Sequence, residues 1–95
     1  MGNEHFANIA KQLVCRWKND NLREREETVS TSDVYVVWIA KVLKNNKAML
    51  ATNHADGLYF EVTYNGDKEE FYLDAYRKQE NLKYVRGEWE GGCRE

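Results

Sequence analysis

Proline is absent from the 95-residue sequence, and cysteine occurs only twice, at Cys15 and Cys93. Two cysteines are too few for a disulfide framework, and neither has a partner at the spacing of metal ligands, so we expect two free thiols. Long apolar runs are also missing, which argues against a membrane-spanning helix. A net charge of −2, from 14 basic and 16 acidic residues, gives no general attraction to duplex nucleic acid or to an anionic membrane.

Targeting signals and phosphate-binding motifs are lacking as well. The first residues, MGNEHFANIAKQL, have no basic stretch, apolar stretch or small-residue cleavage site of a secretory signal, so we expect a cytoplasmic protein. No glycine-rich phosphate loop occurs, because the isolated Gly57 and Gly66 belong to predicted turns. These absences leave a dinucleotide-dependent enzyme without support.

The composition is that of one folded domain covering residues 1–95. Apolar residues make up 42% and charged residues 32% of the chain, which is too apolar for a disordered segment. A chain of this length builds a single, small core. Aromatic residues reach 13%. With no proline to interrupt them, continuous elements that carry aromatic faces are expected.

An α+β fold is predicted, with an N-terminal amphipathic helix packed on a four-stranded antiparallel β-meander. The helix, placed at residues 3–21 within the region 1–22, follows from apolar residues that recur at spacings of three and four. These residues are Phe6, Ile9, Ala10, Leu13, Val14 and Trp17. The meander spans 33–76, and residues 77–95 form a C-terminal short helix or irregular arm. Its strands are predicted at 33–43, 48–52, 58–64 and 68–76.

The dipeptide Asn65-Gly66 predicts a tight hairpin with a type I′ turn, because both residues tolerate positive φ. Pairing across this turn would place Tyr59 near Tyr72 on one face of the sheet. It would also set the carboxylates of Glu61 and Glu70 against each other on that face, which weakens a sheet unless a positive charge lies nearby. The opposite face, where the helix docks, would carry Phe60, Val62, Phe71 and Leu73.

The predicted strand 33–43 is apolar on both faces, so both sides of it need cover. One helix covers only one side of a sheet. Three candidates for the second side remain open: the C-terminal segment with Tyr84, Val85 and Trp89, a second protomer, or a ligand. Strict alternation places Val34, Val36, Trp38, Ala40 and Val42 on one face, and Tyr35, Val37, Ile39 and Leu43 on the other.

Cover from within the chain together with self-association is expected for this second face, with a dimer or a larger homo-oligomer as the result. We expect Trp38, Ile39 and Trp89 at the interface, because large apolar side chains dominate such contacts.

No catalytic constellation is recognised, so the protein is expected not to be an enzyme and to need no cofactor or metal. His54 and Asp56 share a turn and could form half of a metal site, but two ligands do not hold zinc, and turn chemistry explains the pair. Glu61 and Glu70 could act as acid and base, but a cross-strand surface pair without a cleft explains them better.

A recognition surface fits the remaining residues better than a catalytic site does. Tyrosines on the second sheet face offer flat rings with a polar tip, and Lys47 and other cations lie beside them in the predicted sheet. Such a surface would hold a small nucleotide by stacking and phosphate pairing, or would anchor a partner protein through aromatic side chains. The candidate ligand-binding residues are Tyr35, Lys41, Tyr59, Tyr72, Tyr76 and Arg77.

The central block, residues 33–81, resembles a family of small uncharacterised bacteriophage and prophage proteins. The resemblance lies in the run DVYVVW, the turn region KA...T...DG.Y, the hairpin EVTYNGDK and the ending YLDAY.K.EN. The N-terminal helix is similar to the family only in type, and the tail after Tyr84 departs from its pattern.

The resemblance brings no reaction with it, and it implies a phage accessory protein in the cytoplasm of a host bacterium. By analogy, such a protein sequesters a small nucleotide-like signal used in host defence. The alternative is an inhibitor that blocks a host protein through the aromatic sheet face or the C-terminal arm.

Overall fold

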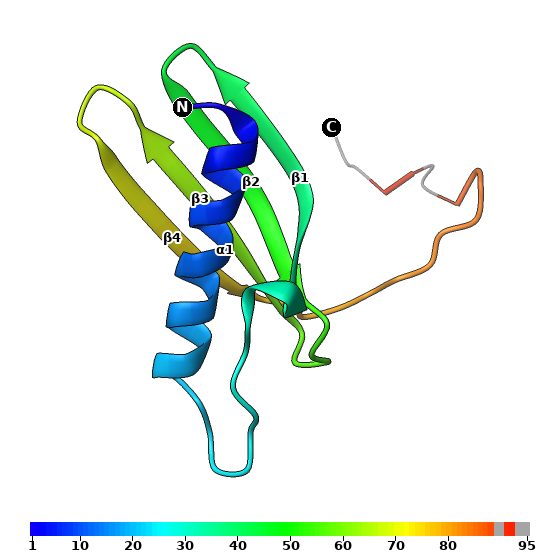
Figure 1. Ribbon diagram of the computed structural model, residues 1–95. Helices are drawn as coiled ribbons and strands as arrows, with labels where there is room; N and C mark the ends of the chain where they lie inside the picture. The colour runs from blue at the N-terminus through cyan, green and yellow to red at the C-terminus, as the bar shows by residue number, and fades with distance from the viewer. Residues whose placement is uncertain (89–90, 93–95) are drawn as a thin grey trace.

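The computed structural model describes residues 1–88 and 91–92, and it has the predicted α+β architecture (Figure 1). One helix packs on one side of a four-stranded sheet whose strands follow in chain order, each antiparallel to the next. The elements are α1 (Asn3–Asp20), the short 3-10 helix η1 (Thr31–Asp33), β1 (Val34–Val42), β2 (Asn45–Thr52), β3 (Leu58–Asn65) and β4 (Glu70–Arg77).

The core lies between α1 and the inner face of the sheet, formed mainly by β1, β2 and β3. Apolar residues at spacings of four, Phe6, Ala10 and Val14, are fully buried, as the amphipathic pattern predicts. Near the end of the helix, the Trp17 ring meets the Phe60 ring edge-on at 5.3 Å between centroids. The sheet contributes Val34, Ala48, Leu50, Phe60 and Val62 to this core.

After α1 the chain returns to the sheet through a loop that is fastened to the helix end. The Asn19 side chain donates to the Val29 carbonyl at 3.0 Å and accepts from the Val29 amide at 2.8 Å. Asn21 ends the helix with its side-chain amide donating to the Trp17 carbonyl at 2.8 Å. The charged stretch 22–28 lies between Asn21 and Val29, so both of its ends are attached to the C-terminal end of α1.

A β-bulge in β1 overturns the strict alternation predicted for this strand. Val36 pairs with Leu50, but Trp38 pairs with the adjacent Met49, so Val37 is an extra residue without a partner in this ladder. The bulge moves Trp38 to the outer face of the sheet, the face opposite α1. It also turns Ile39 inward, where its side chain packs against the core.

The loop between β3 and β4 is longer than the predicted two-residue type I′ turn. The two strands close at the pair Asn65 and Glu70, which leaves residues 66–69 in the loop. The Asn65 side-chain oxygen accepts hydrogen bonds from the amides of Asp67 (3.1 Å) and Lys68 (3.3 Å), so this asparagine organises a wider turn. Gly66 does not have positive φ. A Cβ there would lie 2.2 Å from the Lys44 carbonyl oxygen, so glycine is required for close approach between two turns.

The wider loop shifts the predicted β3–β4 register by four residues. Tyr59 lies opposite Tyr76, and Glu61 lies opposite Asp74, in place of the predicted partners Tyr72 and Glu70. A shift by an even number of residues leaves every side chain on its predicted face. The inward placement of Phe60, Val62, Phe71 and Leu73 is accordingly confirmed.

The C-terminal arm leaves the sheet after β4 and runs away from it (Figure 1). Residues 78–88 contain neither helix nor strand, and Leu82, Tyr84 and Val85 are exposed. The radius of gyration, 16.5 Å, exceeds the roughly 12 Å of a compact domain of this length. The described part of the arm therefore leaves the outer face uncovered. The expected interface residue Trp89 lies outside the described residues.

Within the part of the chain that the structure describes, no helix is both long enough and apolar enough to cross a membrane.

Candidate functional site

The outer face of the sheet gathers five aromatic side chains, which we call the aromatic face. Because side chains alternate between the faces of a strand, residues from three strands share this outer face. Tyr35, Tyr72 and Tyr76 each expose about half of their surface, at 51%, 47% and 49%. Trp38 is 41% exposed, and Tyr59, opposite Tyr76, is partly buried. The aromatic face consists of Tyr35 and Trp38 on β1, Tyr59 on β3, and Tyr72 and Tyr76 on β4.

The other predicted site residues lie elsewhere. Ile39 is taken up by the core. Lys41 pairs with Asn46, a fully buried residue, on the helix side of the sheet. Arg77 lies opposite Leu58 at the end of β4, also on the helix side, and its Nη1 donates to the Asp56 carbonyl at 3.3 Å. The structure therefore places the predicted tyrosines on one face of the sheet, with Tyr35 and the pair Tyr72 and Tyr76 on opposite edge strands, and it places Lys41 and Arg77 on the other face.

Charged groups on the aromatic face are mainly acidic. The Lys47 ammonium on β2 lies 3.0 Å from a Glu61 carboxylate oxygen, and Glu61 lies opposite Asp74. The pKa of Lys47 is raised, first by the hydrogen bond to Glu61 and next by the charge of Glu61. Lys47 is thus the positive charge that an acid pair on this sheet requires. Its charge is already matched, so it does not attract a phosphate to the face.

Glu70 is a further acid on this face, and its carboxylate accepts a hydrogen bond from Tyr72. The two residues are two positions apart on β4, so their side chains point to the same side. The Tyr72 hydroxyl donates to the Glu70 carboxylate, and this hydrogen bond raises the pKa of Tyr72. Among the residues of the four strands, three acids (Glu61, Glu70 and Asp74) and one lysine (Lys47) therefore lie on the same face as the aromatic rings.

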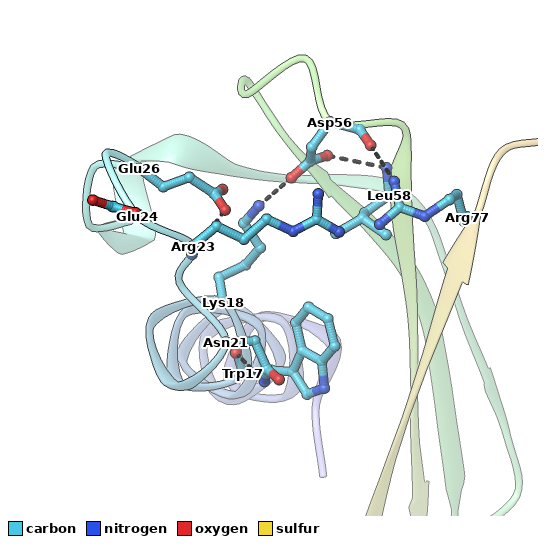
Figure 2. A pocket seen from close by; sticks show the side chains of 9 residues that line it. All are labelled: Trp17, Lys18, Asn21, Arg23, Glu24, Glu26, Asp56, Leu58 and Arg77. Carbon is cyan, nitrogen blue, oxygen red and sulfur yellow. Dashed lines mark hydrogen bonds and ion pairs between the residues drawn. The ribbon is translucent and has the colours of Figure 1, made fainter.

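A pocket of about 510 Å³, which sequence reasoning missed, lies on the other side of the sheet (Figure 2). It is bounded by the end of α1, the loop that follows, the β2–β3 turn and the end of β4. The signal that could have revealed it is Lys18, which continues the buried stripe of Phe6, Ala10 and Val14 at a spacing of four. The lining residues are Trp17, Lys18, Asn21, Arg23, Glu24, Glu26, Asp56, Leu58 and Arg77.

An ion pair between Lys18 and Asp56 forms one wall of this pocket. The Lys18 side chain is only 4% exposed and its ammonium contacts the Asp56 carboxylate. Asp56 also accepts a hydrogen bond from the Leu58 amide at 3.0 Å, as an Asx turn does. Burial by itself would raise the pKa of Asp56, but the hydrogen bond from Lys18, the Leu58 amide and the Lys18 charge together lower it. Asp56 is thus engaged in structure, and the described residues contain no cluster of three or more metal-ligating side chains.

Comparison with known proteins gives a family without an assigned activity. The model of a family of unknown function, DUF6275, matches residues 7–86, which include most of α1, the whole sheet and most of the described arm. This match is wider than the block 33–81 on which the sequence resemblance rests. No curated protein and no solved structure matches the chain. Since the model covers most of its length, the chain belongs to the family of unknown function DUF6275.

Proposed function

We propose that the chain is a non-enzymatic binding protein whose aromatic face holds a partner protein that presents apolar and basic side chains. The observation that carries this proposal is the set of exposed aromatic rings on the side of the sheet that the described residues, 1–88 and 91–92, leave uncovered. Single exposed apolar residues are ordinary on protein surfaces, whereas Tyr35, Trp38, Tyr72 and Tyr76 are four large exposed residues on one face of one sheet. Tyrosine and tryptophan are also the residues that contribute most to protein interfaces.

A hollow at one end of the aromatic face supplies a place for an apolar side chain of the partner. It has a volume of about 310 Å³ and lies beside Trp38, the largest ring of the face. Interface anchors of this kind sit in pockets where surrounding groups exclude water. Its lining residues are Trp38, Ala40, Val42, Asn45, Asn46, Lys47 and Thr63.

The charge of the face favours a basic partner over a second copy of the chain. Glu61, Glu70 and Asp74 outnumber Lys47, which is already paired with Glu61. Two such faces brought together would place acid against acid, whereas lysine or arginine on a foreign partner would complement them. The same surplus disfavours a phosphate-bearing ligand on the tyrosines. The inhibitor alternative is accordingly better supported at this face than nucleotide binding.

The biological setting of the proposal comes from the resemblance to phage proteins. In that setting the partner is a bacterial host protein, such as a component of host defence, and binding blocks its activity in the cytoplasm. Membership of the family does not identify a partner. The same experiment therefore tests the bacterial origin of the partner and the role of the aromatic face.

Affinity capture from bacterial lysate, with matched tyrosine variants as bait, tests the proposal. Tyr72→Ala and Tyr76→Ala each remove a ring from the face, whereas Tyr84→Ala removes an exposed ring from the arm. We expect a stoichiometric partner with a basic contact surface, bound about 30-fold more weakly by either face variant, as for an interface hot spot. Tyr84→Ala should bind it as the unmodified protein does.

Two results would overturn this proposal. Loss of the partner in Tyr84→Ala alone would transfer binding to the arm. A dimer in sedimentation that Tyr72→Ala dissociates would identify a second copy as the occupant of the face.

A further inference from the structure

The pocket beside Trp17 has the size and the boundaries of a small-molecule site. Its volume of about 510 Å³ falls within the usual range of about 300–1,000 Å³ for ligand pockets. Residues far apart in sequence meet there, from Trp17 in α1 to Asp56 after β2 and Arg77 at the end of β4. This pocket lies on the helix side of the sheet, so it is separate from the aromatic face.

Two guanidinium groups in the pocket are left without a carboxylate. Lys18 and Asp56 neutralise each other, and the carboxylate of Glu26 accepts a hydrogen bond from the Arg23 backbone amide at 2.9 Å. In the described part of the chain, neither Arg23 nor Arg77 forms an ion pair. Two like charges directed at one space repel each other, and an anion between them removes that repulsion.

The arrangement of the side chains directs the guanidinium ends of Arg23 and Arg77 toward the same space within the pocket. In Figure 2 the Arg23 and Arg77 side chains extend toward each other from opposite sides of the pocket. The acidic side chains of Glu24 and Glu26 lie at the end of the pocket remote from Arg77. An anion between the two guanidinium groups is therefore kept away from both glutamates. The planar forks of the arginines match the oxygen geometry of a phosphate.

The Trp17 indole adds a flat surface to this anion site. Its ring is held by the edge-on contact with Phe60, at an interplanar angle of 63°, and it remains partly exposed on the pocket side. A fixed aromatic ring stacks on a planar base without losing much conformational freedom. A ligand that combines a planar ring with a phosphate satisfies the indole and both arginines at once.

We propose that this pocket binds a nucleotide, with its phosphate between Arg23 and Arg77 and its base against Trp17. Nucleotide capture, expected from the sequence on the tyrosine face, is thereby assigned to the opposite side of the sheet. This site is independent of protein binding at the aromatic face.

Calorimetric titration with AMP, ADP-ribose and cyclic AMP tests the proposal, with adenosine and inorganic phosphate as partial ligands. Arg23→Gln and Arg77→Gln each remove one guanidinium. The matched control is Arg16→Gln, because Arg16 lies on α1, is highly exposed and pairs with Asp20 outside the pocket. Since Arg77 also bonds to the Asp56 carbonyl, Arg77→Lys serves as a second variant that keeps the charge.

We expect at least one of the three nucleotides to bind, and to bind more tightly than either partial ligand. Arg23→Gln and Arg77→Gln should each weaken this binding by about tenfold or more, as for the loss of a charged hydrogen bond, and Arg77→Lys by less. Arg16→Gln and the face variant Tyr72→Ala should leave the affinity within twofold. The base contact should be visible by NMR as an indole N–H resonance that shifts on titration and is absent in Trp17→Phe.

The proposal fails if none of the three nucleotides binds at millimolar concentration. It also fails if Arg16→Gln weakens binding as much as Arg23→Gln, because the attraction would then come from net charge alone. Equal affinities for nucleotide and for inorganic phosphate would contradict the proposed contact between the base and Trp17.

Discussion

Replacing Asp56 by asparagine would leave the Lys18 ammonium buried without a counter-charge. Asparagine retains a side-chain oxygen for the Leu58 amide, so the Asx turn is kept and the change is confined to the ion pair. Removing one partner of a buried ion pair lowers the free energy of unfolding by about 3–5 kcal/mol. The Asp56 side chain is 21% exposed, so we take the lower end, about 3 kcal/mol. For a domain of this size that corresponds to a fall in Tm of about 12–24 °C.

A double-mutant cycle with Lys18→Met separates the ion pair from the rest of the site. Methionine fills most of the space of the lysine stem without its charge, and it leaves Asp56 next to solvent, so Lys18→Met should cost less than Asp56→Asn. The double variant has no unpaired buried charge and should be close to Lys18→Met in stability. Chemical denaturation should then give a coupling free energy of about 3 kcal/mol between the two positions, equal to the loss expected for Asp56→Asn alone. Single losses that add within about 0.5 kcal/mol would refute the reasoning.

Acid should abolish the stability that the ionised Asp56 carboxylate contributes through its ion pair with Lys18. The folded pKa of Asp56 is lowered from its ordinary value of 3.8, so the unfolded chain takes up a proton at that carboxylate before the folded chain does. The stability that Asp56 contributes is therefore complete above pH 3.8 and is lost as the pH falls below it through the folded pKa. The difference in unfolding free energy between the unmodified protein and Asp56→Asn should shrink over that interval. A constant difference would contradict an ionised Asp56.

Three further predictions concern the turns, the aromatic face and the core. Gly66→Ala should lower the free energy of unfolding by about 1–3 kcal/mol, because its Cβ meets the Lys44 carbonyl, whereas Gly2→Ala, with open space around it, should be neutral; equal stability of the two variants would contradict the close approach. Spectroscopic titration should show Tyr72 ionising above its ordinary pKa, and Glu70→Gln, which removes the accepting carboxylate, should bring that pKa down; an unchanged titration would exclude the hydrogen bond. Burial, followed by the charge of Asp33, raises the pKa of the Cys15 thiol. In a Cys93→Ser variant, a disulfide reagent should therefore label Cys15 slowly in the native protein and quickly in the urea-unfolded protein. Equal labelling rates would show that the thiol is accessible in the native protein.

The helix and the sheet faces could be predicted from the sequence because they follow from local periodicity. Phe6, Ala10 and Val14 mark the buried stripe of α1, and the alternation of Phe60 and Val62 marks the inner face of β3. The same alternation placed the tyrosines of β3 and β4 on one outer surface. These placements tolerate a register error of an even number of residues, which is why the wrong turn at Gly66 did not disturb them.

The remaining features depend on contacts between distant parts of the chain, which periodicity does not contain. The bulge at Val37 inverts the second half of β1, and no proline or glycine marks it in the sequence. Asn65 and Gly66 fit a type I′ turn, but the Lys44 carbonyl next to Gly66 belongs to another hairpin. The Lys18–Asp56 pair and the approach of Arg23 to Arg77 likewise join segments that only the folded chain brings together.

Photo-crosslinking from the aromatic face tests the central claim most directly. Benzoylphenylalanine would be placed at Tyr76, on the face, and in a parallel sample at Tyr84, on the arm, because both positions are exposed aromatic residues. We predict that irradiation in bacterial lysate yields a specific covalent product with a different protein from position 76 and not from position 84. Crosslinking from position 84 alone, or only to a second copy of the chain, would contradict a face built for a foreign partner.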